Sequence, residues 1–262
     1  MMLEHAIVGI DLSPTTDQLL SEVRHLERLG VKRLALVMVL GGPYPQAPEE
    51  RHRDHYQTRL EELAAHFDDL EVTVEVRSGH PSAELQRAAE QGAAGLIVVG
   101  SHGHTPVRDL FLGSTVLDLA RTSRRPLLLL PLGDPRPDRG GGVLLATDGS
   151  TSAGPAEQLA LELGRDLGGS AVTVIVPSRD GEAREQQASD HLDQLVDGIL
   201  SPRVEMGPKP ETITALADEQ AADVIVVGAR GRNPLAALLL GSTAEHLLRT
   251  SRRPVLLVPG PR

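Results

Sequence analysis

The sequence contains no cysteine and no tryptophan, and aromatic residues make up only 2% of its 262 residues. The absence of cysteine excludes disulfides, thiol nucleophiles and cysteine-based metal sites. The shortage of aromatic side chains argues against a surface on which the bases of single-stranded nucleic acid stack. The formal net charge of -10 also opposes general nucleic-acid binding, because attraction to phosphates needs a basic surface. A chain of this charge can still hold one nucleotide locally.

Long hydrophobic runs are also missing. No apolar stretch approaches the roughly 20 residues that cross a bilayer, and the longest, such as Pro126–Pro131, have the length of strands. The first residues do not combine a basic segment with a long apolar one, so we expect no signal peptide. The sequence therefore predicts a cytoplasmic protein without a membrane or nucleic-acid partner.

The chain repeats itself. The triplet Gly113-Ser114-Thr115 recurs 128 residues later as Gly241-Ser242-Thr243, and Arg121–Pro126 recurs at the same offset as Arg249–Pro254. Such self-similarity indicates a duplication. A stretch rich in proline, glycine and charge lies between the repeats, as is typical of a linker. We predict a first domain over residues 1–132, a linker over 133–142 and a second domain over 143–262.

Each half alternates short apolar runs with amphipathic segments, which indicates an α/β fold with a mostly parallel sheet and helices on both faces. A first helix is expected to start at Ser13-Pro14. Sheets of this kind bind ligands beyond the carboxyl ends of their strands, where the strand order switches direction. Strands are expected over 6–10, 34–40, 72–76, 96–99 and 127–130, and again over 144–146, 172–176, 204–206, 224–227 and 255–258.

Glycines frame the loop after the fourth predicted strand in the pattern G-x2-G-x9-G-[ST], once in each half. Glycine lets backbone N–H groups approach an anion closely and tolerates positive φ. The last glycine precedes a predicted helix, whose free N–H groups favour phosphate. The pattern therefore predicts a phosphate-binding loop, although one copy alone also fits a pair of turns and a helix cap. The glycines are Gly100, Gly103 and Gly113 in the first half and Gly228, Gly231 and Gly241 in the second.

A second motif, Asp-x-Ser, follows the first predicted strand of each half. It consists of Asp11 and Ser13 in the first half and of Asp148 and Ser150 in the second. These residues are expected at the same edge of the sheet as the glycine loop. Helix capping is the alternative explanation for the motif.

The combination of Asp-x-Ser, the glycine pattern and a final R-R-P-[VL]-L-L-[LV]-P strand resembles the universal stress protein family, in its ATP-binding branch, over both halves. The resemblance implies a Rossmann-like five-stranded parallel sheet of order 3-2-1-4-5 in each half. It also implies ATP, with or without Mg²⁺, across strands one and four. Asp11 and Asp148 would face the adenosine, and the backbone of Val39 and Val176 would contact adenine. The phosphates would lie on Gly100, Gly103, Gly113, Ser114 and Thr115, and on Gly228, Gly231, Gly241, Ser242 and Thr243.

The two loops carry different side chains. His102 and His104 flank the middle glycine of the first half, whereas Arg230 and Arg232 flank that of the second. Arginine stays charged and pairs with phosphate, whereas histidine near its ordinary pKa is mostly neutral at pH 7. We therefore predict tighter ATP binding by the second half at neutral pH, and a gain in affinity by the first half on acidification. Side chains that point into solvent are the alternative.

Three functions fit these features. The first is a nucleotide-dependent stress-response protein that signals to a protein partner of unknown identity. The second is a slow ATPase, for which no dedicated base, catalytic residue or metal ligand is identified. The third is a structural module with vestigial loops. The resemblance further implies an intramolecular pseudo-dimer of the two halves, and it leaves a further homo-oligomer open.

Overall fold

The computed structural model describes residues 3–41, 53–67, 69–101, 112–132, 138–175, 181–230 and 240–261. By their internal contacts these residues divide into two compact units, built chiefly from the first and the second repeat. These units are the first half and the second half of the molecule.

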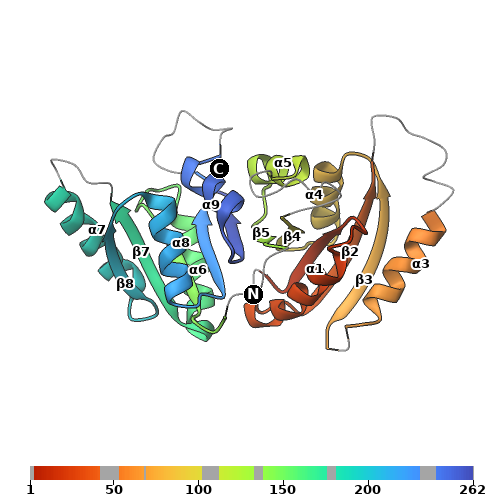
Figure 1. Cartoon of the computed structure of the whole chain (residues 1–262), viewed down its shortest axis with the longest axis horizontal. Coiled ribbons are helices and arrows are strands. Elements are labelled where there is room, and N and C mark those ends of the chain that lie inside the picture. Colours follow the sequence, from red (N-terminus) through yellow and green to blue (C-terminus); the bar gives the residue numbers. More distant parts are fainter. Residues whose placement is uncertain are drawn as a thin grey trace. The chain divides into compact units, whose positions relative to one another are not determined.

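The first half forms a parallel sheet (Figure 1). Strand β1 lies between β2 and β4, and β3 and β5 follow on either side, so the order 3-2-1-4-5 is confirmed. The central strands are apolar and buried, as expected of a parallel sheet that is covered on both faces. The strands are β1 His5–Ile10, β2 Arg33–Leu40, β3 Glu71–Ser78, β4 Leu96–Gly100 and β5 Leu127–Leu130.

Helices cover both faces of this sheet. The chain runs outward from β1 to β2 and β3, and then returns to the other side of β1 to form β4 and β5. Because such crossovers are right-handed, the helices after β1 and β2 lie on one face of the sheet and those after β3 and β4 lie on the other. On the first face, the Arg24 guanidinium donates to the carbonyl of His66 and so joins the segments that follow α1 and α3. The helices are α1 Thr16–Val23, continued by a 3₁₀ turn η1 Arg24–Leu29, α3 Arg53–Ala64, α4 Pro81–Gln91 and α5 Ser114–Thr122.

The second half repeats this arrangement with the order β8-β7-β6-β9-β10, which is again 3-2-1-4-5 within the repeat. The strands are β6 Val143–Ala146, β7 Gly169–Ile175, β8 Ser201–Met206, β9 Val224–Gly228 and β10 Val255–Val258. The helices are α6 Gly154–Leu167, α7 Gly181–Val196, α8 Lys209–Glu219 and α9 Ser242–Thr250.

The first helix begins two residues later than Ser13-Pro14 predicted. The amide of Thr16 donates to the carbonyl of Ser13 over 3.0 Å, so a turn precedes the helix. This turn matters for the site, because it keeps the Asp-x-Ser motif outside the helix, at the edge where the strand order switches direction.

Candidate functional site

In the second half, the predicted phosphate loop begins and ends at one point of the sheet edge. Gly228 ends β9, which pairs with β6, so the loop starts beside the Asp148 turn that follows β6. Gly241 immediately precedes α9, and its amide donates to the carbonyl of Ala229 over 2.9 Å. This hydrogen bond joins the two ends of the loop. Residues 231–239 of the loop, Gly231 and Arg232 among them, lie outside the described part of the chain.

A cavity of about 470 Å³ lies at this edge, within the range of small-molecule sites. Val172, Val174, Val227 and Ile213 supply apolar walls, and Lys209 adds a positive charge at the start of α8. The cavity also brings together six of the residues predicted from the sequence. These are Asp148, Gly228, Arg230, Gly241, Ser242 and Thr243.

The start of α9 is open to a ligand. The residue before the helix is Gly241, at φ −64° and ψ 139°, and no side chain caps the helix. The first N–H groups of a helix have no partner within it, so a glycine at this position leaves them available to an anion. The hydroxyls of Ser242 and Thr243 line the same cavity and add donors beside these N–H groups.

The Asp-x-Ser motifs form the same turn in both halves. Oδ1 of Asp11 accepts the amide of Ser13, and Oδ1 of Asp148 accepts the amide of Ser150, both over 3.0 Å. Neither of the following helices has a side-chain cap, so helix capping does not explain the motif. Instead, each aspartate holds its own turn and places a carboxylate at the carboxyl end of the first strand.

The predicted residues of the first half occupy the corresponding places. Asp11 follows β1, Gly100 ends β4, Val39 lies near the end of β2 and Gly113 precedes α5. Ser114 and Thr115 form the start of α5. Gly103, His102 and His104 lie outside the described residues.

The surroundings of these residues differ from those in the second half. The first half has Gly9 where the second half has Ala146. The Leu85 side chain lies 3.1 Å from the place that a Cβ would take at position 9, so the space there is narrow. By the 128-residue offset, the counterpart of Lys209 in the first half is Pro81. The first half therefore lacks a cation at the start of its third helix, where the second half has one.

Strand register shows which residues near the ends of the second strands correspond in the two halves. Gly9 pairs with Val37 in the first half, and Ala146, at the same distance before the aspartate, pairs with Val172 in the second. Two residues further along each strand, Val39 therefore corresponds to Val174. Val176, the residue that the resemblance implies as the adenine contact of the second half, lies outside the described residues. Val174 is buried and lines the cavity.

A buried polar network beneath the second-half turn was not predicted. Thr147 Oγ1 donates to the Glu157 carboxylate and accepts the amide of Gly149 over 3.1 Å. His191 Nε2 lies 3.0 Å from Glu157 Oε1, which links α7 to α6 and to the turn. In the first half the counterparts of Thr147 and Glu157 are the apolar Ile10 and Leu20. Lys209 was not predicted as a site residue either. Its position just after the third predicted strand could have indicated it, because the carboxyl end of that strand lies at the same sheet edge.

In the described part of the chain, no helix has both the length and the apolar character needed to cross a membrane. The same residues contain no cluster of three or more histidine, aspartate or glutamate side chains arranged to hold a metal ion.

Comparison with known proteins identifies the class. The profile of the Universal stress protein family matches residues 2–131 and 142–259, and the chain belongs to this family. The universal stress protein Rv1996 of Mycobacterium tuberculosis is 24% identical over 216 residues, which cover 73% of this chain and 67% of that protein. The matches span between 33% and 67% of the lengths of the first three curated relatives.

Solved structures agree with the fold. A universal stress protein from Archaeoglobus fulgidus superposes with a TM-score of 0.76 at 22% identity, covering 99% of each chain. Another universal stress protein, solved in complex with cAMP, matches 45% of this chain and 97% of its own length, with 26% identity and a TM-score of 0.37.

Proposed function

We propose that this chain is an ATP-binding universal stress protein of the cytoplasm and that its second half carries the principal nucleotide site. The observation that supports the proposal is the cavity of about 470 Å³, where the Asp148 carboxylate, the glycine ends of the loop, and the cations Lys209 and Arg230 line one space. Apolar walls with a few convergent polar groups are the usual form of a small-molecule site.

Each part of ATP has a complementary group in this cavity. The triphosphate would lie on Gly228, Gly241 and the start of α9, with Lys209 and Arg230 to balance its charge. The ribose hydroxyls would donate to the Asp148 carboxylate, as acidic residues at strand ends do in nucleotide-binding sheets. The adenine would lie toward Val174, near the end of β7.

Magnesium, where present, would be held largely by the phosphates. Mg²⁺ retains several waters and takes few protein ligands in nucleotide sites. The hydroxyls of Ser242 and Thr243 and the Asp148 carboxylate are oxygen groups of the kind that it prefers, so the described residues fit a nucleotide-bound ion. The ion would balance phosphate charge, while this chain's donors orient the phosphates.

The first half is proposed as a second, weaker site. It keeps the turn of Asp11 and the glycines Gly100 and Gly113, but it has Pro81 where the second half has Lys209. Nucleotide binding would change the conformation of the chain for a protein partner only to the extent that ATP prefers one conformation over another.

Nucleotide content tests this proposal directly. Acid extraction of the purified protein followed by nucleotide chromatography should release an adenine nucleotide, and calorimetric titration of the stripped protein should give ATP binding. Asp148→Ala should weaken the tighter binding event, while the matched variant Asp11→Ala should leave it unchanged. Absence of ATP binding to the folded wild-type chain would contradict the proposal. A phosphate-release assay on the same samples separates a binding protein from a slow ATPase.

A further inference from the structure

A second cavity adjoins the proposed nucleotide site of the second half. It measures about 220 Å³ and lies over the end of β7, between α7 and the start of α8. Asp148, Val174 and Lys209 line both this cavity and the larger one. A ligand in the larger cavity therefore has a neighbouring space on the side away from the glycine loop.

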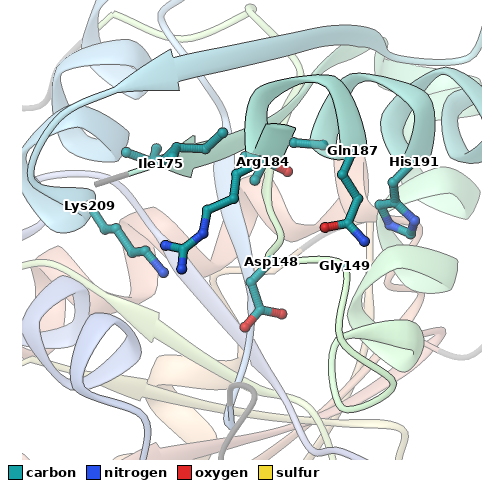
Figure 2. Close-up of a pocket in the computed structure, with 10 residues that line it drawn as sticks. Asp148, Gly149, Ile175, Arg184, Gln187, His191 and Lys209 are labelled. Atoms are coloured by element: carbon teal, nitrogen blue, oxygen red, sulfur yellow. The ribbon is translucent and has the colours of Figure 1, made fainter. Parts of the chain in front are cut away.

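Three polar side chains point into this smaller cavity. Figure 2 shows Arg184 and Gln187 reaching down from α7, and Lys209 reaching in from the side, toward the space above Asp148. None of these three side chains makes a hydrogen bond or an ion pair in the part of the chain that the structure describes. All three can donate hydrogen bonds.

The charges in the smaller cavity favour an anion. Arg184 and Lys209 contribute two positive charges, and Asp148 supplies the one carboxylate among the described residues that line it. Oδ1 of that carboxylate already accepts the amide of Ser150 over 3.0 Å. His191 also lines the cavity, but its Nε2 is engaged by Glu157. Two cations that face the same space repel each other unless an anion binds between them.

The first half does not repeat this arrangement. Helices α3 and α7 align by their buried leucines, Leu60 and Leu192, so Gln187 corresponds to His55. His55 lines a different cavity, of about 630 Å³, which is bordered by Leu12 and does not include Asp11. Pro81 stands in place of Lys209. Among the described residues, this pair of cations beside the aspartate turn therefore occurs in the second half and not in the first.

We propose that the second half binds adenine nucleotides that carry a second phosphate on the ribose, with that phosphate between Arg184 and Lys209. The inference rests on the proposed function, which places the ribose beside Asp148. An arginine beside the ribose-binding carboxylate is the arrangement by which nucleotide-binding sheets accept a ribose phosphate in place of a free hydroxyl. Gln187 would donate a further hydrogen bond to the same group.

The test compares ligands that differ by one phosphate. AMP, adenosine 2′,5′-bisphosphate, adenosine 3′,5′-bisphosphate and ATP are titrated calorimetrically into the full chain. At least one bisphosphate should bind about tenfold more tightly than AMP, the gain expected of one charge-assisted contact. Because Arg184 is exposed, this advantage should shrink as salt is raised.

Two variants locate the effect. Arg184→Gln should remove the preference for the bisphosphate while leaving the affinity for AMP unchanged, and Arg165→Gln, an exposed arginine on α6, should keep the preference. Binding of ATP and AMP with no advantage for either bisphosphate overturns this inference and leaves the proposed function intact. An advantage that survives in Arg184→Gln also overturns it. Failure of every nucleotide to bind overturns both.

Discussion

The two halves of the molecule have the same backbone plan and different chemistry at the edge where a ligand would bind. Both have the strand order 3-2-1-4-5 and an aspartate that holds its own turn. At that edge the second half has Thr147 and Lys209, whereas the first has Ile10 and Pro81. The two halves therefore share the aspartate and the strand order that shape this edge, while the side chains that set its charge and polarity differ.

The largest expected difference concerns a buried arginine before the last strand. Arg253 is 3% exposed; it donates to Asp218 over 2.8 Å, to the carbonyl of Ala222 over 3.0 Å and to the carbonyl of Asp138. The counterpart Arg125 makes no side-chain hydrogen bond or ion pair within the described residues. Arg253→Ala should lower the free energy of unfolding by about 3 kcal/mol, because it removes the donor to the buried carbonyl of Ala222 and the partner of Asp218. Arg125→Ala should change it by less than about 1 kcal/mol, and urea denaturation of both variants measures the contrast.

Equal losses in the two variants would show that the arginines act alike despite their different surroundings. Separate probes for each half, such as hydrogen exchange of β4 and β9 amides, keep the result interpretable if the halves unfold at different denaturant concentrations.

The next effect concerns the cation at the start of the third helix. Lys209→Ala should weaken ATP binding by the second half about 10- to 100-fold, because a hydrogen bond to a charged group contributes about 1.5–3 kcal/mol. The reciprocal variant Pro81→Lys should strengthen binding by the first half. Calorimetry on the full chain measures both. A loss in the first variant without any gain in the second would show that the halves differ by more than this one charge.

Much of this comparison could be predicted from the sequence. The apolar runs around Ile97 and Val226 predicted strands, and the repeated spacing predicted two α/β domains with glycines and an aspartate at one sheet edge. These features are local, because strand periodicity, turns and glycine positions are properties of neighbouring residues.

What escaped prediction depends on contacts between distant segments. In the sequence, Glu157 resembles an ordinary surface residue of an amphipathic helix. Only the fold brings Thr147 and His191 into contact with it. The correspondence between Val39 and Val174 required the strand register, because the connection between the first two strands is two residues shorter in the second half. Neither the pairing of strands nor the satisfaction of a buried carboxylate is encoded in a short window of sequence.

A smaller effect concerns the residue between Asp and Ser in the turn. It has positive φ in both halves, +67° for Gly149 and +52° for Leu12. Glycine adopts this conformation freely, whereas a residue with a Cβ incurs about 1–2 kcal/mol. Gly149→Ala should destabilise the second half by about 1 kcal/mol, and it also brings a Cβ to 3.3 Å from the His191 ring. Leu12→Gly should stabilise the first half by up to about 1 kcal/mol. Thermal unfolding of both variants checks these opposite signs, and a loss in both would contradict the argument.

The smallest expected effect is the different response of the two loops to pH. His102 and His104 flank the glycine of the first loop, and protonation below their ordinary pKa adds positive charge near the proposed phosphates. Arg230 stays charged throughout, so ATP binding by the second half should lack this gain. Lowering pH from 8 to 6 should therefore strengthen binding by the first half up to about fivefold relative to the second, the scale of an exposed charge contact. The Lys209→Ala and Asp11→Ala variants allow each half to be titrated with little contribution from the other. Protonation of the ATP phosphates affects both halves alike, so it cancels in the ratio of their ATP affinities. A ratio that does not change with pH would show that the two histidines do not contribute to ATP binding.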